Sequence, residues 1–139
     1  MCGEEKTTGP AAYYFVSNVN GTKYYFAGSI SSGVGKMTTD VTKAALVYKE
    51  EVSGGYYLYI LNGTTKQYIY ITGTSSKNFG LGTTKQVLKD ITVGGVTTIG
   101  NGSRAFSLYN KAEFRTYAAS TANNFNGTNG YGVSLEAVN

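Results

Sequence analysis

Short stretches of the chain alternate between two kinds of side chain with a period of two, most clearly between residues 56 and 72. Tyr57 and Tyr59 alternate with aliphatic residues there, and Tyr68 and Tyr70 do the same after a turn. A period of two is that of a β-strand, whose successive side chains point to opposite faces. The pattern predicts a β-hairpin with four tyrosines on one face and the aliphatic side chains facing the core.

Three of the five Asn-Gly pairs in the chain, those that begin at Asn20, Asn62 and Asn101, each lie between two strand-like stretches. This pair favours a type I′ hairpin turn, because both central residues of that turn have positive φ. The flanking strands are expected at residues 13–17 and 23–27, 56–61 and 67–72, and 96–99 and 104–109. The sequence therefore predicts three hairpins.

The turns recur at intervals of about 40 residues, which is a repeat period that has to be considered before any other fold. Further strands are expected near residues 33–39, 80–84 and 113–117, and closing strands at 44–49, 87–93 and 132–138. This gives twelve strands in three repeats, at about 12–52, 53–93 and 94–139. We expect a single all-β domain over residues 12–139, preceded by a flexible tail at residues 1–11.

Three repeats of about 40 residues with four short strands each resemble the β-trefoil superfamily, in which six strands form a barrel that three hairpins cap. The last repeat is similar to trefoil-like modules of surface and secreted Bacteroidales proteins, through Leu108, Tyr109 and Asn110 in one strand and Phe114 and Tyr117 in the next. The resemblance implies a pseudo-threefold fold. There is no Trp, so the sugar sites of ricin-type lectins are not implied. A β-sandwich is the alternative.

Composition agrees with a folded β domain, because 41% of residues are hydrophobic, 14% are charged, and there are 13 Tyr and 19 Gly against one Pro. The net charge is +4, but the 12 basic residues are scattered among 8 carboxylates. We therefore do not expect the protein to bind nucleic acid, because proteins that do so usually gather their basic residues on one face.

Cys2 is the single cysteine, so no intrachain disulfide is possible. Its setting resembles the lipidated start of a mature bacterial lipoprotein, and a chance match is the alternative. The chain as given has no apolar run of about 18 residues and no recognisable export signal. We expect no membrane span, and an extracellular, cell-surface or virion-associated location.

Catalytic side chains are scarce, because the chain has no His, the commonest general base and metal ligand. The carboxylates form no acidic motif, and no glycine loop of the phosphate-binding kind is present. We expect that the protein is not an enzyme and needs no metal or cofactor.

Two groups of residues are candidates for binding. Tyr57, Tyr59, Tyr68 and Tyr70 are expected to form a shelf for a sugar ring or a protein, or to pair only with one another. One basic residue follows each turn, and these residues are Lys23, Lys66 and Arg104. They are expected either to bind an anion or to discourage aggregation at strand edges. Residues 118–132 are expected to form a long exposed loop.

Two classes of function follow from these features. The first is a lectin-like module that binds glycans or cell-surface ligands. The second is a protein-binding trefoil, acting as an accessory of a virus or phage particle or as a small inhibitor of a host protein. The sequence leaves the oligomeric state open.

Overall fold

The computed structural model describes residues 11–138, in which all the regular structure is β apart from two single-turn 3-10 helices, η1 (Val41–Lys43) and η2 (Ala122–Asn124). The prediction of an all-β fold is confirmed. Cys2, and all of the predicted tail except its last residue, lie outside the described residues.

Thirteen short strands make up this part of the chain. They are β1 (Ala12–Val19), β2 (Thr22–Ser31), β3 (Val34–Thr38), β4 (Val47–Val52), β5 (Gly55–Asn62), β6 (Thr65–Ile71), β7 (Phe79–Gly82), β8 (Lys89–Val93), β9 (Val96–Gly100), β10 (Arg104–Tyr109), β11 (Glu113–Ala118), β12 (Gly130–Gly132) and β13 (Ser134–Ala137).

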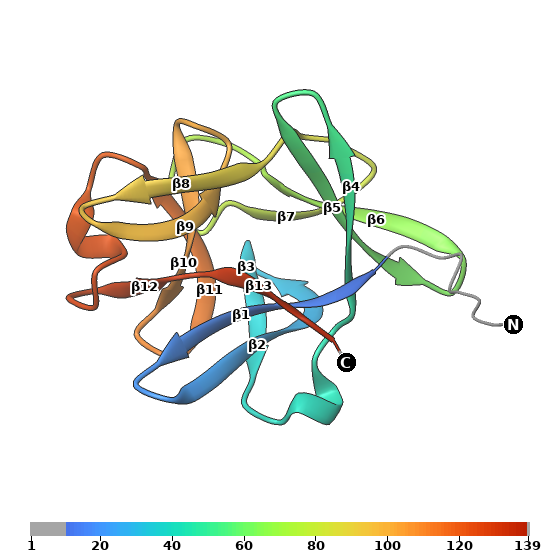
Figure 1. The fold of residues 1–139 in the computed structure, drawn as a ribbon, viewed down its shortest axis with the longest axis horizontal. Helices are drawn as coiled ribbons and strands as arrows, with labels where there is room; N and C mark the ends of the chain where they lie inside the picture. Colours follow the sequence, from blue (N-terminus) through green and yellow to red (C-terminus); the bar gives the residue numbers. More distant parts are fainter. Residues whose placement is uncertain (1–10, 139) are drawn as a thin grey trace, which may run out of the picture.

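The strands form one open antiparallel sheet in the order β7-β6-β5-β4-β1-β2-β3-β11-β10-β9-β8. β12 joins it beside β10, and β13 lies beside β1, as Figure 1 shows. The hydrogen-bonded ladder is not closed into a barrel. The antiparallel all-β architecture is thus established, and the trefoil arrangement stays a prediction.

The thirteenth strand arises because the predicted closing strand at residues 132–138 is divided at Val133. The residues before the break pair with β10, and those after it pair with β1. Val133 itself is buried and its N–H donates to the Thr98 hydroxyl at 3.0 Å. A side chain of β9 therefore takes the place of a ladder partner at the point where the chain changes strands.

The Asn-Gly pairs at Asn20, Asn62 and Asn101 all form turns, but of three kinds. Asn20 and Gly21 have φ of 53° and 91°, as a type I′ turn requires. In the second turn Asn62 pairs with Thr65, so Gly63 takes the first central position, with φ of 64°. In the third, the Asn101 side chain accepts hydrogen bonds from two following backbone N–H groups, which makes a local turn of its own. The type I′ prediction is therefore wrong for the second and third turns.

Phenylalanine dominates the core. Five of the six Phe residues lie in one cluster, each at most 2% exposed, with ring centroids 4.9 to 6.5 Å apart, mostly edge to face. They are Phe15, Phe26, Phe79, Phe106 and Phe114. The predicted aliphatic face of β5 and β6 joins them, since Leu58, Ile60, Ile69 and Ile71 belong to the same cluster. Rings from distant segments thus hold the sheet around one core.

Candidate functional site

The predicted tyrosine shelf lies on the outer face of β4, β5 and β6. Tyr59 faces Tyr68 across the ladder, and their ring centroids are 5.6 Å apart. Tyr57 meets Tyr68 edge to face at 6.0 Å, and Tyr48 of β4 stacks on Tyr59 at 5.4 Å. These four residues are called the tyrosine cluster below.

Most of the ring surface in the tyrosine cluster is covered by neighbours. Tyr59 and Tyr68 are each only 6% exposed. Lys66 Nζ lies 4.6 Å from the Tyr59 ring centroid, and Lys85 Nζ lies 5.5 Å from that of Tyr68. The tyrosine rings are thus packed against one another across the strands and covered by lysine ammonium groups through cation–π contacts.

Tyr70, the fourth predicted shelf residue, lies over β7 instead. It is half-buried, and a Cβ built on Gly80 would come within 2.8 Å of its ring. The structure therefore brings together Tyr57, Tyr59 and Tyr68 with Lys66. Tyr70 instead packs against Gly80 of β7.

The three basic residues that follow the turns have different surroundings. Lys23 forms an ion pair with Glu136 at 2.9 Å, which raises the lysine pKa from its ordinary value. Lys66 covers Tyr59, as described above. Arg104 is 8% exposed, and its guanidinium donates to the backbone carbonyls of Thr74, Ser75 and Thr116. Burial lowers the Arg104 pKa from its ordinary value. Each side chain is thus engaged within the protein, and Arg104 makes the most hydrogen bonds, although its buried Nε has no partner among the described residues.

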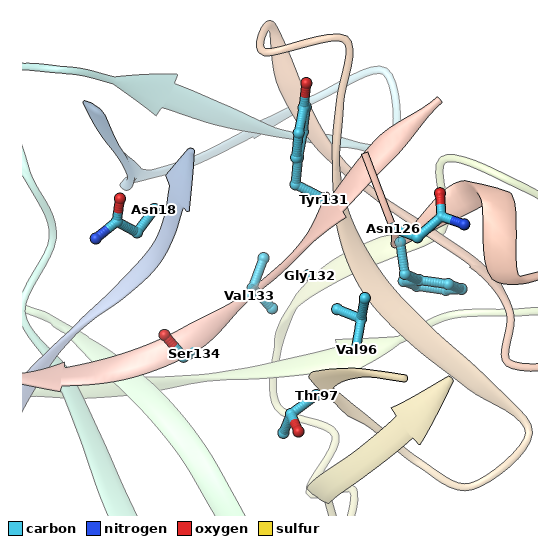
Figure 2. Close-up of a pocket in the computed structure, with 9 residues that line it drawn as sticks. Asn18, Val96, Thr97, Asn126, Tyr131, Gly132, Val133 and Ser134 are labelled. Carbon is cyan, nitrogen blue, oxygen red and sulfur yellow. The ribbon is translucent and has the colours of Figure 1, made fainter. Parts of the chain in front are cut away.

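A surface pocket of about 330 Å³ lies where β1, β9 and the C-terminal segment meet (Figure 2). Its apolar lining residues are Val96, which is half-buried, and Phe125 and Val133, which are each only 1% exposed. Its polar walls carry amide, hydroxyl and phenol groups, from Asn18, Thr97, Asn126, Tyr131 and Ser134. None of the lining residues is charged. The volume is at the lower end of the roughly 300–1,000 Å³ found for small-molecule sites.

No family model, curated protein or solved structure matches this chain. The residues of the pocket themselves indicate which ligand chemistry it suits. The Asn18 Oδ1 accepts from the Gly21 N–H at 2.9 Å, and the Asn126 Oδ1 accepts from the Thr128 N–H at 3.1 Å. With both amide oxygens engaged, Asn18 presents its NH₂ group as a donor, and Asn126 presents one N–H, because its other N–H donates to the Asn123 Oδ1 at 3.5 Å. Amide donors, hydroxyls, one aromatic ring and the partly exposed Val96 suit a neutral, polyhydroxylated ligand.

The wall of the pocket that comes from residues 118–132 is held in place from inside. Phe125 is 1% exposed and packs with Val93 and Ala105 in a second apolar cluster. The buried Ser107 hydroxyl donates to the Asn124 carbonyl at 2.6 Å. The expectation of an exposed loop is thus wrong for Phe125, and the pocket wall is ordered before any ligand arrives, which lowers the entropy cost of binding.

A smaller cavity of about 180 Å³ adjoins this pocket and is lined by Tyr13, Lys49 and Asp90, among others. The Tyr56 hydroxyl donates to the Asp90 Oδ1 at 2.6 Å. Burial, together with this bond, raises the pKa of Tyr56 above its usual range. The Lys49 Nζ lies 5.1 Å from the Tyr56 ring centroid and 3.3 Å from Glu51.

Residues 11–138 contain no group of three or more His, Cys, Asp or Glu side chains placed to hold a metal ion. In the described range, no helix has the length and hydropathy needed to cross a bilayer.

The sequence singled out the stretch 118–132 as a whole and Asn126 as the start of an Asn-Gly-Thr motif, but not Tyr131. The Asn-Gly-Thr signal at Asn126 is a turn signal and carries no information about a pocket. Asn18 and Thr97 are brought to the same site only by the fold, since they come from β1 and β9. No local pattern could have joined these four residues.

Proposed function

We propose that this protein is a non-enzymatic recognition domain that binds a neutral glycan in the pocket of Figure 2. The observation that carries the proposal is the uncharged lining, in which the Tyr131 ring, two amides and two hydroxyls lie beside the partly exposed Val96. A sugar ring has an apolar face and a rim of hydroxyls, so each part of it meets a matching group. The absence of His from the sequence supports the non-enzymatic part.

The β-trefoil remains part of the proposal. It is supported by a circuit of contacts in which β1 pairs β4, β4 pairs β5, β8 pairs β9 and β13 pairs β1. A bridge between Tyr56 and Leu88 joins β5 to β8, and β9 contacts β12 and β13. If β12 and β13 are counted as one strand interrupted at Val133, these are the six strands that a trefoil would use for its barrel. An experimental structure in which no threefold axis relates the turns at Asn20, Asn62 and Asn101 would refute it.

Glycan binding is tested on an array of neutral glycans with the wild-type chain and two tyrosine variants. We expect Tyr131→Ala to abolish the signal, because it removes the ring from the pocket wall. Tyr57→Ala is the matched control, since Tyr57 is another half-buried tyrosine but lies in the tyrosine cluster. Loss of signal in the control alone would move the site to that cluster. An empty array with folded protein would count against glycan binding.

Protein recognition is the second candidate, and an exposed apolar groove favours it. The groove has a volume of about 370 Å³ and is lined by Ala45, Leu46, Tyr48 and Leu61, among others. Leu46 and Leu61 are 43% and 45% exposed, which is unusual for neighbouring leucines on a small domain. A protein partner that binds the wild type and Val87→Lys but not Leu46→Lys would support this function. Val87 is 38% exposed and does not line the groove.

A further inference from the structure

The pocket of Figure 2 and the smaller cavity are neighbours along one line of the surface. Thr97, Val133 and Ser134 line both of them. This line is the seam between β9 and the C-terminal strands, where the strands are in contact without forming a ladder. The two hollows therefore meet at shared walls.

The backbone of Thr97 faces this seam. Val93 and Val96 close a two-residue turn, so their pair is hydrogen-bonded and the next pair, Thr92 with Thr97, is not. The Thr97 N–H and C=O accordingly point away from β8. A Cβ built on Gly132 would lie 2.8 Å from the Thr97 carbonyl oxygen, which confirms the direction. Backbone groups thus add hydrogen-bonding capacity between the two hollows.

The smaller cavity places a donor and an acceptor on its walls. The hydrogen bond from Tyr56 engages one of the two carboxylate oxygens of Asp90 and fixes the orientation of the group. The Lys49 ammonium has three N–H donors, and Glu51 lies within reach of it at 3.3 Å. A ligand hydroxyl can both accept from Lys49 and donate to Asp90. Tyr13 and Leu135 supply apolar surface beside them.

We infer that the two hollows form one groove that binds a neutral oligosaccharide of at least two units, the second held through its hydroxyls by Lys49 and Asp90. This inference rests on the proposed glycan function and deepens it. An acidic chain is disfavoured, because Asp90 lines the cavity and Glu51 is paired with the lysine that would have to attract it. A single sugar would leave the smaller cavity and its oriented carboxylate unused.

The test is calorimetric titration of the full chain with neutral probes of increasing length. The probes are glucose, galactose and N-acetylglucosamine, and the uniform di- and trisaccharides built from each. We expect at least one trisaccharide to bind ten or more times tighter than its monosaccharide. Asp90→Asn should lower the trisaccharide affinity about tenfold and leave the monosaccharide affinity unchanged. Tyr131→Ala should abolish binding of both.

Glu51→Gln is the matched control, because Glu51 contacts Lys49 but does not line the cavity, and it should leave the trisaccharide affinity within twofold. Equal affinity for all lengths would overturn the inference and leave the proposed function standing. The same holds if Asp90→Asn weakens mono- and trisaccharide binding equally. Binding of none of the probes to folded protein would overturn both.

Discussion

The hydroxyl of Thr98 links β9 to β10 and to Val133, the residue between β12 and β13, and its removal should be costly. Thr98 is fully buried in β9, donates to the Phe106 carbonyl of β10 at 2.7 Å, and accepts from the Val133 N–H at 3.0 Å. Thr98→Val keeps the shape of the side chain and removes both bonds. The change therefore isolates the hydrogen bonds from any cavity effect.

The expected cost follows from the two backbone groups that lose a partner. A buried donor or acceptor left unsatisfied costs about 1–3 kcal/mol, and a carbonyl with a second lone pair costs less than an N–H. We expect Thr98→Val to lower the free energy of unfolding by about 2–4 kcal/mol. For a domain of this size that is a fall in Tm of roughly 10 °C.

Urea unfolding, followed by tyrosine fluorescence and far-UV circular dichroism, measures this change directly. Thr92→Val is the matched control, since Thr92 is exposed on the neighbouring strand and faces Thr97 across the ladder. It should change the free energy of unfolding by less than about 0.5 kcal/mol. If the two variants have equal stability, the side-chain bridge at the seam does not stabilise the fold and the reasoning is refuted.

Three further perturbations test other parts of the fold, each by equilibrium unfolding. Arg104→Lys keeps the charge but loses the planar fork that serves three carbonyls, and should cost about 2 kcal/mol; an unchanged stability would contradict the structural role. Phe125→Ala should cost about 3 kcal/mol, because the ring is 1% exposed beneath the pocket wall; a cost below about 1 kcal/mol would mean that the wall has another anchor. The pKa of the Tyr56 hydroxyl is raised in the folded state, so this group stays protonated at a pH at which the unfolded chain releases the proton. The contribution of Tyr56 to the free energy of unfolding is therefore full below about pH 10 and is lost as the pH rises further. The stability advantage of wild type over Tyr56→Phe should accordingly shrink above pH 10, and a pH-independent difference would contradict the assignment.

Strands and their inward faces could be predicted because that information is local. The alternation that placed Leu58 and Ile69 toward the core depends only on a period of two, and the two residues do face each other in the ladder. The positions of the turns were predicted for the same reason. The type was predicted correctly for the first turn only, because strand register decides which residue becomes central, as at Gly63.

The surroundings of single charges could not be read from the sequence. Arg104 looked equivalent to Lys23 and Lys66, yet it bonds to a carbonyl thirty residues away and became part of the interior. The pocket of Figure 2 was not predicted for a related reason, since Asn18 and Tyr131 line one pocket only after β13 pairs with β1. Such long-range pairings depend on the whole topology rather than on any local pattern.

The pairing of β1 with β13 also bears on how the chain reaches its folded state. β1 has ladder partners in β2, β4 and β13, and the Ser17 hydroxyl bonds to the Gly132 carbonyl across 115 residues of sequence. During synthesis on the ribosome, the residues of β1 that are buried in the folded protein, such as Phe15, therefore lack some of their packing partners until nearly all of the domain has been made. Contacts this distant slow folding, and we expect refolding over milliseconds to seconds, with the seam between β9 and β13 closing late.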